Sequence, residues 1–302
     1  MSSALQKAES LQATYRRLAV DCVARAIAAL DEPRGRDIAI HTIRKQCKQA
    51  RALIRLFCDD PPAARRNACQ FYRELGRSLS AARDARVALD VHALLLDRFG
   101  AVLDTAAVAS VGRRLEQDLR SKRGDADGQP IGGPALRRQL LAARVRARRT
   151  VIAGDAEESL RAAFLRAYRR ARRAARAAAE SNLPSAFHEA RKRTKDYWYQ
   201  LEFVAGRWPA IAPGRIAAAR RLTELLGDAQ DCEVYAAAVS RRARRRASPG
   251  TELLLALAEH RARALRQEAL QLCPEVFGGK PRELMAAIEQ PEPLEPLHRA
   301  AG

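Results

Sequence analysis

Apolar residues recur at three- and four-residue spacing along nearly the whole chain, and strand-like alternation is absent. This spacing puts apolar side chains on one face of a helix, which is typical of amphipathic helices. The sequence therefore predicts an all-α fold of about eight to ten helices, some of them continuous with their neighbours. The helical segments are expected at 4–30, 38–58, 62–82, 84–98, 104–122, 134–153, 156–180, 185–206, 213–228, 229–246, 250–272 and 281–289.

One polar segment rich in glycine and proline, SKRGDADGQPIGGP at 121–134, interrupts this pattern near the middle of the chain. Such a run cannot bury enough apolar surface to order itself. It predicts an exposed linker at 123–133 between a first helical repeat at 5–122 and a second at 134–290. We expect residues 291–302 to form a disordered tail.

The two halves share a spaced pattern of residues. Shifting the sequence by 147 residues aligns 41–87 with 188–234 without a gap, and twelve of the 47 aligned positions are identical. The identical positions include both charged and apolar residues over two helices, which indicates an internal duplication. We therefore expect two similar helical bundles related by a pseudo-two-fold axis.

The helix expected at 38–58 has a cationic ridge along one face. At about 100° per residue, the side chains of the ridge share an arc of about 120°. They are His41, Arg44, Lys45, Lys48, Arg51 and Arg55. The opposite arc is apolar and holds Ile40, Ile43, Cys47, Ala50, Ile54 and Phe57. Like charges at this spacing destabilise a helix, so the ridge predicts an anionic ligand that reverses the sign of the interaction.

Two further segments carry basic ridges. The helix at 185–206 repeats the first ridge with His188, Arg191, Lys192 and Lys195, but continues with Trp198, Tyr199 and Glu202. The preceding helix carries Arg166, Arg169, Arg170, Arg173 and Arg176. Antiparallel packing of these two helices would form a basic trough, and we expect the two sides of the site to be unequal.

Each half also contains an arginine and an aspartate eleven residues apart, Arg73 with Asp84 and Arg220 with Asp231. This spacing is about three helical turns, so each pair is expected to share a helix face. If that helix packs beside the ridge, the aspartate could hold a cation by a charged hydrogen bond. A local ion pair that contributes little is the alternative.

The charge balance favours a phosphate-bearing partner. The chain has 55 lysines and arginines against 35 aspartates and glutamates, a net charge of +20, and only seven of the 55 are lysines. Arginine presents a fork of donors that matches phosphate oxygens, and an anionic partner would relieve the self-repulsion. A solvated basic helix surface is the alternative.

The six cysteines show no C-x-x-C pair and fall in helical segments, which is typical of reduced core residues in a cytosolic protein. The N-terminal segment lacks the apolar core of a signal peptide, and no run of about 18 uncharged apolar residues could span a bilayer. We therefore expect a cytoplasmic protein.

The segments HTIRKQCKQARALIRLF at 41–57 and HEARKRTKDYWYQLEFV at 188–204 resemble the repeated signature of the CHAD family, the conserved histidine α-helical domain. RSLSAARDARV at 77–87 and ELLGDAQDCEV at 224–234 are similar to the helix that follows it, and the resemblance covers about residues 5–290. It implies two four-helix bundles about a pseudo-two-fold with a basic central cavity, binding of inorganic polyphosphate, and association with polyphosphate granules. The resemblance also implies that the residues matching the family motif contact polyphosphate. They are His41, Arg44, Lys45, Lys48, His188, Arg191, Lys192 and Lys195.

The chain departs from the family pattern at two positions. Ser80 stands where the first repeat should have a glycine, and Gln230 replaces the arginine of the second repeat. A CYTH triphosphate domain with an E-x-E-x-K strand often accompanies the family but has no counterpart here. Its hydrolase activity is therefore not carried over.

Other functions are less well supported by the residues. No phosphate-binding P-loop, paired carboxylates or activated nucleophile is recognisable, so we expect no enzyme and no cofactor, although His188 could in principle accept a phosphoryl group. Cations around the histidines disfavour a metal ion, and both histidines are expected to gain charge near neutral pH. Nucleic acid is the main rival partner, because a basic trough reads phosphates and Trp198 and Tyr199 could stack bases.

Overall fold

The computed structural model describes residues 9–31, 35–58, 62–103, 105–123, 133–152, 156–208, 211, 213–241 and 248–289. Within these ranges the regular elements are helices, and no β-strand is present. They are α1 (Leu11–Asp31), α2 (Arg36–Phe57), α3 (Pro62–Ser78), α4 (Ser80–Phe99), the 3₁₀ helix η1 (Gly100–Val102), α5 (Thr105–Arg123), α6 (Gly133–Arg149), α7 (Ala156–Ser181), α8 (Pro184–Val204), α9 (Pro213–Ser240), α10 (Pro249–Phe277) and α11 (Pro281–Glu289).

The structure confirms the all-α prediction and adds one difference between the halves. The segments predicted at 213–228 and 229–246 are joined without a break in one helix, α9, which ends at Ser240, and residues 242–246 lie outside the described residues. The aligned segment of the first half is broken at Leu79, which separates α3 from α4. Most of the predicted linker at 123–133 and all of the predicted tail at 291–302 lie outside the described residues.

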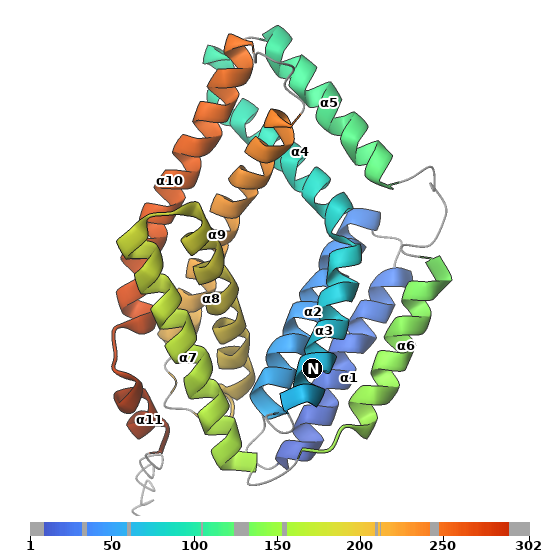
Figure 1. Cartoon of the computed structure of the whole chain (residues 1–302), viewed down its shortest axis with the longest axis vertical. Helices are drawn as coiled ribbons and strands as arrows, with labels where there is room; N and C mark the ends of the chain where they lie inside the picture. The colour runs from blue at the N-terminus through green and yellow to red at the C-terminus, as the bar shows by residue number, and fades with distance from the viewer. Residues whose placement is uncertain are drawn as a thin grey trace, which may run out of the picture.

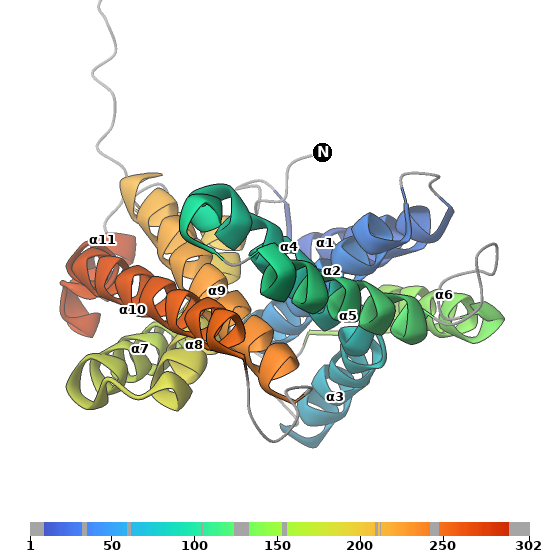
Figure 2. The same cartoon turned by 90° about the horizontal axis from the view of Figure 1, so that it is seen from above.

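The helices gather on two sides of the molecule (Figure 1). On one side α2 packs against α1 and α3, and α6 packs against α1; on the other α8 packs between α7 and α9, and α9 packs against α10. The two sides meet where α2 contacts α8 and α7, and where α4 contacts α9. Seen from above, α4 and α5 cross over the two groups (Figure 2). The helix α6, which follows the predicted linker, thus packs on the first half of the chain, and the internal duplication itself stays a prediction.

The apolar arcs of the ridge helices hold them in the core. The arc predicted for α2 is buried from Ile40 to Phe57, and Ile43 is fully enclosed. In α8, Tyr197 packs against Phe164 and Tyr168 of α7, with ring centroids 5.5 Å apart in both cases. Large buried side chains therefore fix the backbone that presents the basic faces, because a close-packed core leaves little freedom for the helix to rotate.

All six cysteines are free thiols, and four of them are buried. Burial raises the pKa of the Cys47 thiol to about 12, so this side chain behaves as a small core residue. Among the residues that the structure describes, no helix is both long and apolar enough to cross a membrane.

Candidate functional site

A cavity of about 480 Å³ lies where α2 and α8 meet α4 and α9. Its basic lining comes from all four helices and consists of His41, Arg44, Lys45, Lys48, Arg83, Arg191, Lys195 and Arg220. Five carboxylates share the cavity, namely Asp84, Glu202, Glu224, Asp228 and Asp231. The structure thus brings cations of the first and second ridges into one space.

Lys48 of α2 and Lys195 of α8 are half-buried lysines of this cavity, one from each motif helix. Burial lowers the pKa of Lys48 to about 7, helped by the positive charges of Lys195 and Arg191. Burial also lowers the pKa of Lys195 to about 8, and Arg191 adds to the effect. Both shifts have the sign expected of ammonium groups that lose water and face other cations. An anion bound between them would remove this repulsion.

His41 lies beside the same cations, but its residue is exposed to solvent. Partial burial, followed by the charges of Arg83 and Lys48, lowers the pKa of His41 to about 4. The lowered pKa disfavours the charged form of His41 near neutral pH in the free protein, and the expected gain of charge stays a prediction for the bound state. A phosphate ligand would raise its pKa again, because it adds a negative charge beside the ring.

Arg44 has a structural as well as an electrostatic role. Its guanidinium donates a hydrogen bond to the backbone carbonyl of Gly76 at the end of α3. Burial lowers its pKa, and Asp84 opposes that shift. Substitution of Arg44 would therefore disturb the packing of α2 on α3 as well as the charge of the cavity.

The aspartates line the cavity as expected, but they do not hold the cations directly. Within the described part of the chain, neither Asp84 nor Asp231 forms a hydrogen bond or ion pair with a lysine or arginine. Burial raises the pKa of Asp231, although Arg191 and Arg83 act in the opposite direction. The two carboxylates reduce the net charge of the cavity rather than fixing one rotamer.

One predicted pairing is wrong for the first half. Arg73 and Asp84 do not share a helix face, because the break at Leu79 puts Arg73 on α3 and Asp84 on α4. Arg73 lines a different pocket, whereas Asp84 lines the cavity. In the second half, α9 is continuous, and Arg220 and Asp231 line the cavity together.

The third ridge does not complete the cavity either. Arg166 and Arg170 line a separate groove with Arg55 and Arg73, which involves the opposite face of α8. Arg169 and Arg173 line a further pocket of about 410 Å³ that Pro281 of α11 borders. The predicted trough between the α7 ridge and the His188 ridge is therefore wrong, since the two ridges point to different spaces.

Three other predicted site residues are not part of the cavity lining. His188 is exposed, and its Nδ1 atom pairs with the Oε1 atom of Gln230. Lys192 is exposed and forms an ion pair with Glu189 at 2.7 Å. Arg51 is half-buried, and its pKa is lowered by burial and by Arg55.

Sequence reasoning missed several lining residues of the cavity. Arg83 directly precedes Asp84, and the Arg-Asp pair of the first repeat was a visible signal for it. Thr223, Glu224 and Asp228 carry no such signal, because they line the cavity only through the rotation of α9. Spacing on one helix does not reveal which neighbouring helix turns toward it.

The sequence matches the family model described as the CHAD domain over residues 17–240. The chain belongs to the CHAD domain family. The matched region contains both motif helices, α2 and α8, and all of the residues that line the cavity. No curated protein has a sequence similar enough to match the chain.

Solved structures share the fold of this CHAD protein. One is the crystal structure of the CHAD domain from the plant Ricinus communis, with a TM-score of 0.62 and 20% identity over 94% of this chain and 93% of that one. Another is PptA from Streptomyces chartreusis, with a TM-score of 0.65 and 17% identity over 89% of this chain and 99% of that one. At these identities the likeness concerns the fold alone.

Proposed function

We propose that this CHAD protein binds inorganic polyphosphate in the cavity between α2, α4, α8 and α9, and that its role is binding rather than catalysis. The observation that carries the proposal is the meeting of Lys48 and Lys195, from the two motif helices, in one cavity with lowered pKa values. Two repelling ammonium groups destabilise the free protein. A chain of phosphates placed between them would offset that repulsion and would meet cations on both sides.

The shape and lining of the cavity fit a thin phosphate chain better than a nucleic acid. Tyr199 is buried, so its ring is closed to a nucleobase. Trp198 stacks on Tyr199 with ring centroids 4.8 Å apart, and the Nζ atom of Lys195 lies 5.8 Å from each ring centroid. The aromatic rings thus support the lysine instead of presenting a free stacking platform of the kind that single-stranded nucleic acids need.

Association with polyphosphate granules follows from the same proposal. A protein whose cavity holds polyphosphate would collect wherever the polymer is concentrated. The family membership and the charge of +20 support this localisation.

The proposal is tested by measuring the affinity for long-chain polyphosphate at several salt concentrations. Binding should weaken steeply as salt rises, because several cations displace counterions together. In the variant Lys45→Glu/Lys48→Glu/Lys195→Glu, affinity should fall by about a hundredfold or more, since like charges then face the polymer. Arg44 is left unchanged in this variant because it also binds the carbonyl of Gly76.

A matched control separates the cavity from the general charge of the protein. Arg138, Arg148 and Arg149 lie exposed on α6 and line neither the cavity nor the groove. Reversing these three charges should change affinity by less than about threefold at moderate salt, because exposed charges are screened. Equal losses in both variants, or equal competition by single- or double-stranded nucleic acid, would show that the protein binds polyanions without using the cavity.

A further inference from the structure

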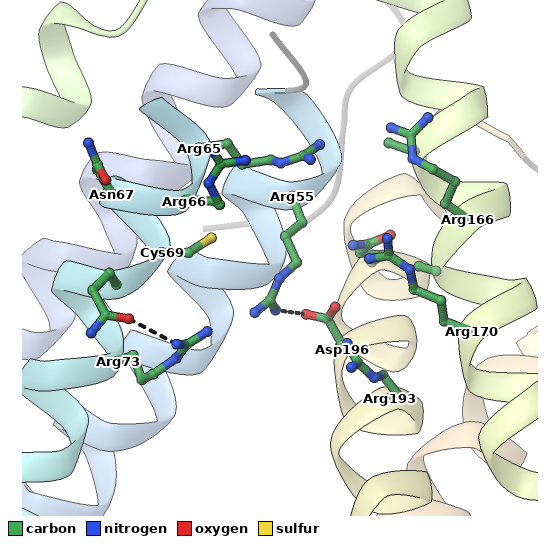
Figure 3. Close-up of a pocket in the computed structure, with 14 residues that line it drawn as sticks. Arg55, Arg65, Arg66, Asn67, Cys69, Arg73, Arg166, Arg170, Arg193 and Asp196 are labelled. Atoms are coloured by element: carbon green, nitrogen blue, oxygen red, sulfur yellow. Dashed lines mark hydrogen bonds and ion pairs between the residues drawn. The ribbon is translucent and has the colours of Figure 1, made fainter. Parts of the chain in front are cut away.

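A second basic space lies between α3 and α7, with the C-terminal part of α2 and one face of α8 as its floor (Figure 3). Its volume is about 360 Å³. Seven arginines line it, namely Arg55, Arg65, Arg66, Arg73, Arg166, Arg170 and Arg193. We call this space the arginine groove.

The arginine groove is separate from the cavity because it uses the other face of α8. Arg191 and Lys195 line the cavity, whereas Arg193 and Asp196 line the groove. With about 100° between successive residues, these two pairs project to opposite sides of the helix. The pair formed by α2 and α8 therefore stands between the two basic spaces.

The groove has a larger excess of positive charge than the cavity. Its lining has seven arginines against the one acidic residue Asp196, whereas the cavity has seven lysines and arginines against five carboxylates. Asp196 is already bound, because its Oδ1 atom accepts a hydrogen bond from Arg55 at 2.6 Å (Figure 3). Arg193 is also paired, with Glu189 outside the lining, at 2.6 Å. The lining itself therefore has six more arginines than carboxylates.

Arg170 shows the consequence of this excess. It is an exposed residue of α7 and forms no hydrogen bond or ion pair within the described part of the chain. Burial of part of its side chain and the charges of Arg193 and Arg166 lower its pKa. A guanidinium among other guanidinium groups is stabilised by an anion, and its planar fork suits phosphate oxygens.

The remaining lining of the groove indicates what kind of anion fits. Its small or apolar side chains are Ala163, Ala167 and Cys69, and none of its lining residues is aromatic. Such a lining offers no ring against which a base or another flat group could stack. The groove therefore offers guanidinium groups, which suit phosphate oxygens, without a surface for stacking.

We propose that the arginine groove is a second polyphosphate-binding site, so that one molecule of this protein holds two condensed-phosphate segments on opposite faces of the α2–α8 pair. This inference rests on the proposed function for the identity of the ligand, but not for the existence of the anion site. The two segments come either from two polymer chains, which the protein would then bridge, or from one chain that passes around the protein.

Equilibrium dialysis with tripolyphosphate tests the inference, because this probe is too short to occupy both sites. The groove variant is Arg166→Glu/Arg170→Glu, the cavity variant is Lys45→Glu/Lys48→Glu, and the control is Arg138→Glu/Arg148→Glu on α6. The full-length protein and the control should bind two tripolyphosphates per chain, and each site variant should bind one. Circular dichroism checks that each variant is folded. If the reversed charges prevent folding, Arg66→Gln/Arg170→Gln, at two exposed positions, replaces the groove variant.

The outcomes separate this inference from the proposed function. One bound tripolyphosphate in the full-length protein, lost in the cavity variant and kept in the groove variant, overturns the groove site and leaves the cavity intact. Loss in the groove variant with no change in the cavity variant overturns the proposed cavity site while the groove stands. Absence of binding in the unmodified protein contradicts both.

Light scattering with long-chain polyphosphate then distinguishes the two sources of the segments. If the protein bridges chains, particle size should rise on mixing and should stay low for the groove variant, although that variant still binds polymer. If one chain occupies both sites, scattering should stay low for both proteins while the groove variant binds the polymer more weakly.

Discussion

The helices α2 and α8 carry the same His-x-x-Arg-Lys-x-x-Lys motif, yet the structure uses them differently. In α2, His41, Lys45 and Lys48 line the cavity. In α8, only Lys195 and Arg191 of the motif do so, whereas Lys192 binds Glu189 at the surface. The same spacing of residues therefore does not give the same contacts, because the neighbouring helices decide which part of each ridge is enclosed.

One difference between the two histidines lies outside the motif, in the residue at aligned positions 83 and 230. Arg83 of α4 is among the cations that lower the pKa of His41, whereas its aligned residue Gln230 pairs with His188. A guanidinium repels a protonated imidazole, but an amide oxygen accepts a hydrogen bond from it. His41 thus faces a positive charge that repels its protonated form, whereas His188 already has a hydrogen-bond partner within the protein.

The largest contrast is expected at the aligned pair Lys45 and Lys192. Lys45→Glu should weaken polyphosphate binding by about tenfold to a hundredfold, since it puts a carboxylate in the cavity. Lys192→Glu should change affinity by less than about threefold, because Lys192 is exposed and outside the lining. Calorimetric titration of both variants with the same polymer makes the comparison. Equal losses would mean that the two ridges contribute equally.

Lys48 should show a conflict between binding and stability. Lys48→Met removes a half-buried ammonium that other cations repel, so the free protein should gain about 0.5–2 kcal/mol in its free energy of unfolding. Affinity for polyphosphate should fall by about tenfold in the same variant. Thermal unfolding without ligand and binding at fixed salt measure the two effects. A destabilised Lys48→Met variant would show that the ammonium is satisfied in the free protein.

The pH dependence of binding should follow the lysines. In the free protein the pKa of Lys48 is lowered to about 7 and that of Lys195 to about 8 by burial and by cations on α2, α4 and α8. A bound polyanion raises both pKa values, so binding takes up protons between the free and bound values. Affinity should therefore rise as pH falls from about 10, the ordinary range of lysine, toward about 7.

The variant Lys48→Arg tests this assignment, because arginine keeps its charge throughout the range. It should lose a large part of the pH dependence and retain affinity at alkaline pH. Dissociation constants measured across the range, with proton uptake from calorimetry in two buffers, give the answer. An unchanged pH profile in Lys48→Arg would assign the titration to another group.

The smallest effect concerns the histidines in the absence of ligand. Arg83→Gln gives His41 the neutral neighbour that His188 already has, so the pKa of His41 should rise from about 4 toward the ordinary histidine value. Its ring signals, followed by NMR during an acid titration, report this directly. Should the pKa of His41 stay where it is, burial and the lysines would account for the whole shift.

The sequence predicted the parts of the fold that depend on one helix at a time. The apolar arc of α2 could be read from its spacing, and it is buried as expected. The position of the break could not, because the spacing predicted a boundary between residues 82 and 84, whereas the break lies at Leu79 and the aligned segment in α9 continues through Leu226 as a helix. This break turns Arg73 toward the groove and leaves Asp84 in the cavity. The arginine groove was likewise hidden, since it joins residues from four helices that no single periodicity connects.

Fluorescence of Trp198 gives the most direct test of the central claim, that the cavity shared by α2 and α8 is the polyphosphate site. The chain has two tryptophans, and Trp208 is buried beside Phe164 and away from the cavity lining. In a Trp208→Phe variant, the emission that remains therefore comes from Trp198 in the cavity. It should change on addition of polyphosphate with the same midpoint as binding, and the change should vanish in the Lys45→Glu/Lys48→Glu/Lys195→Glu background. Full binding without any change in Trp198 emission would contradict the account.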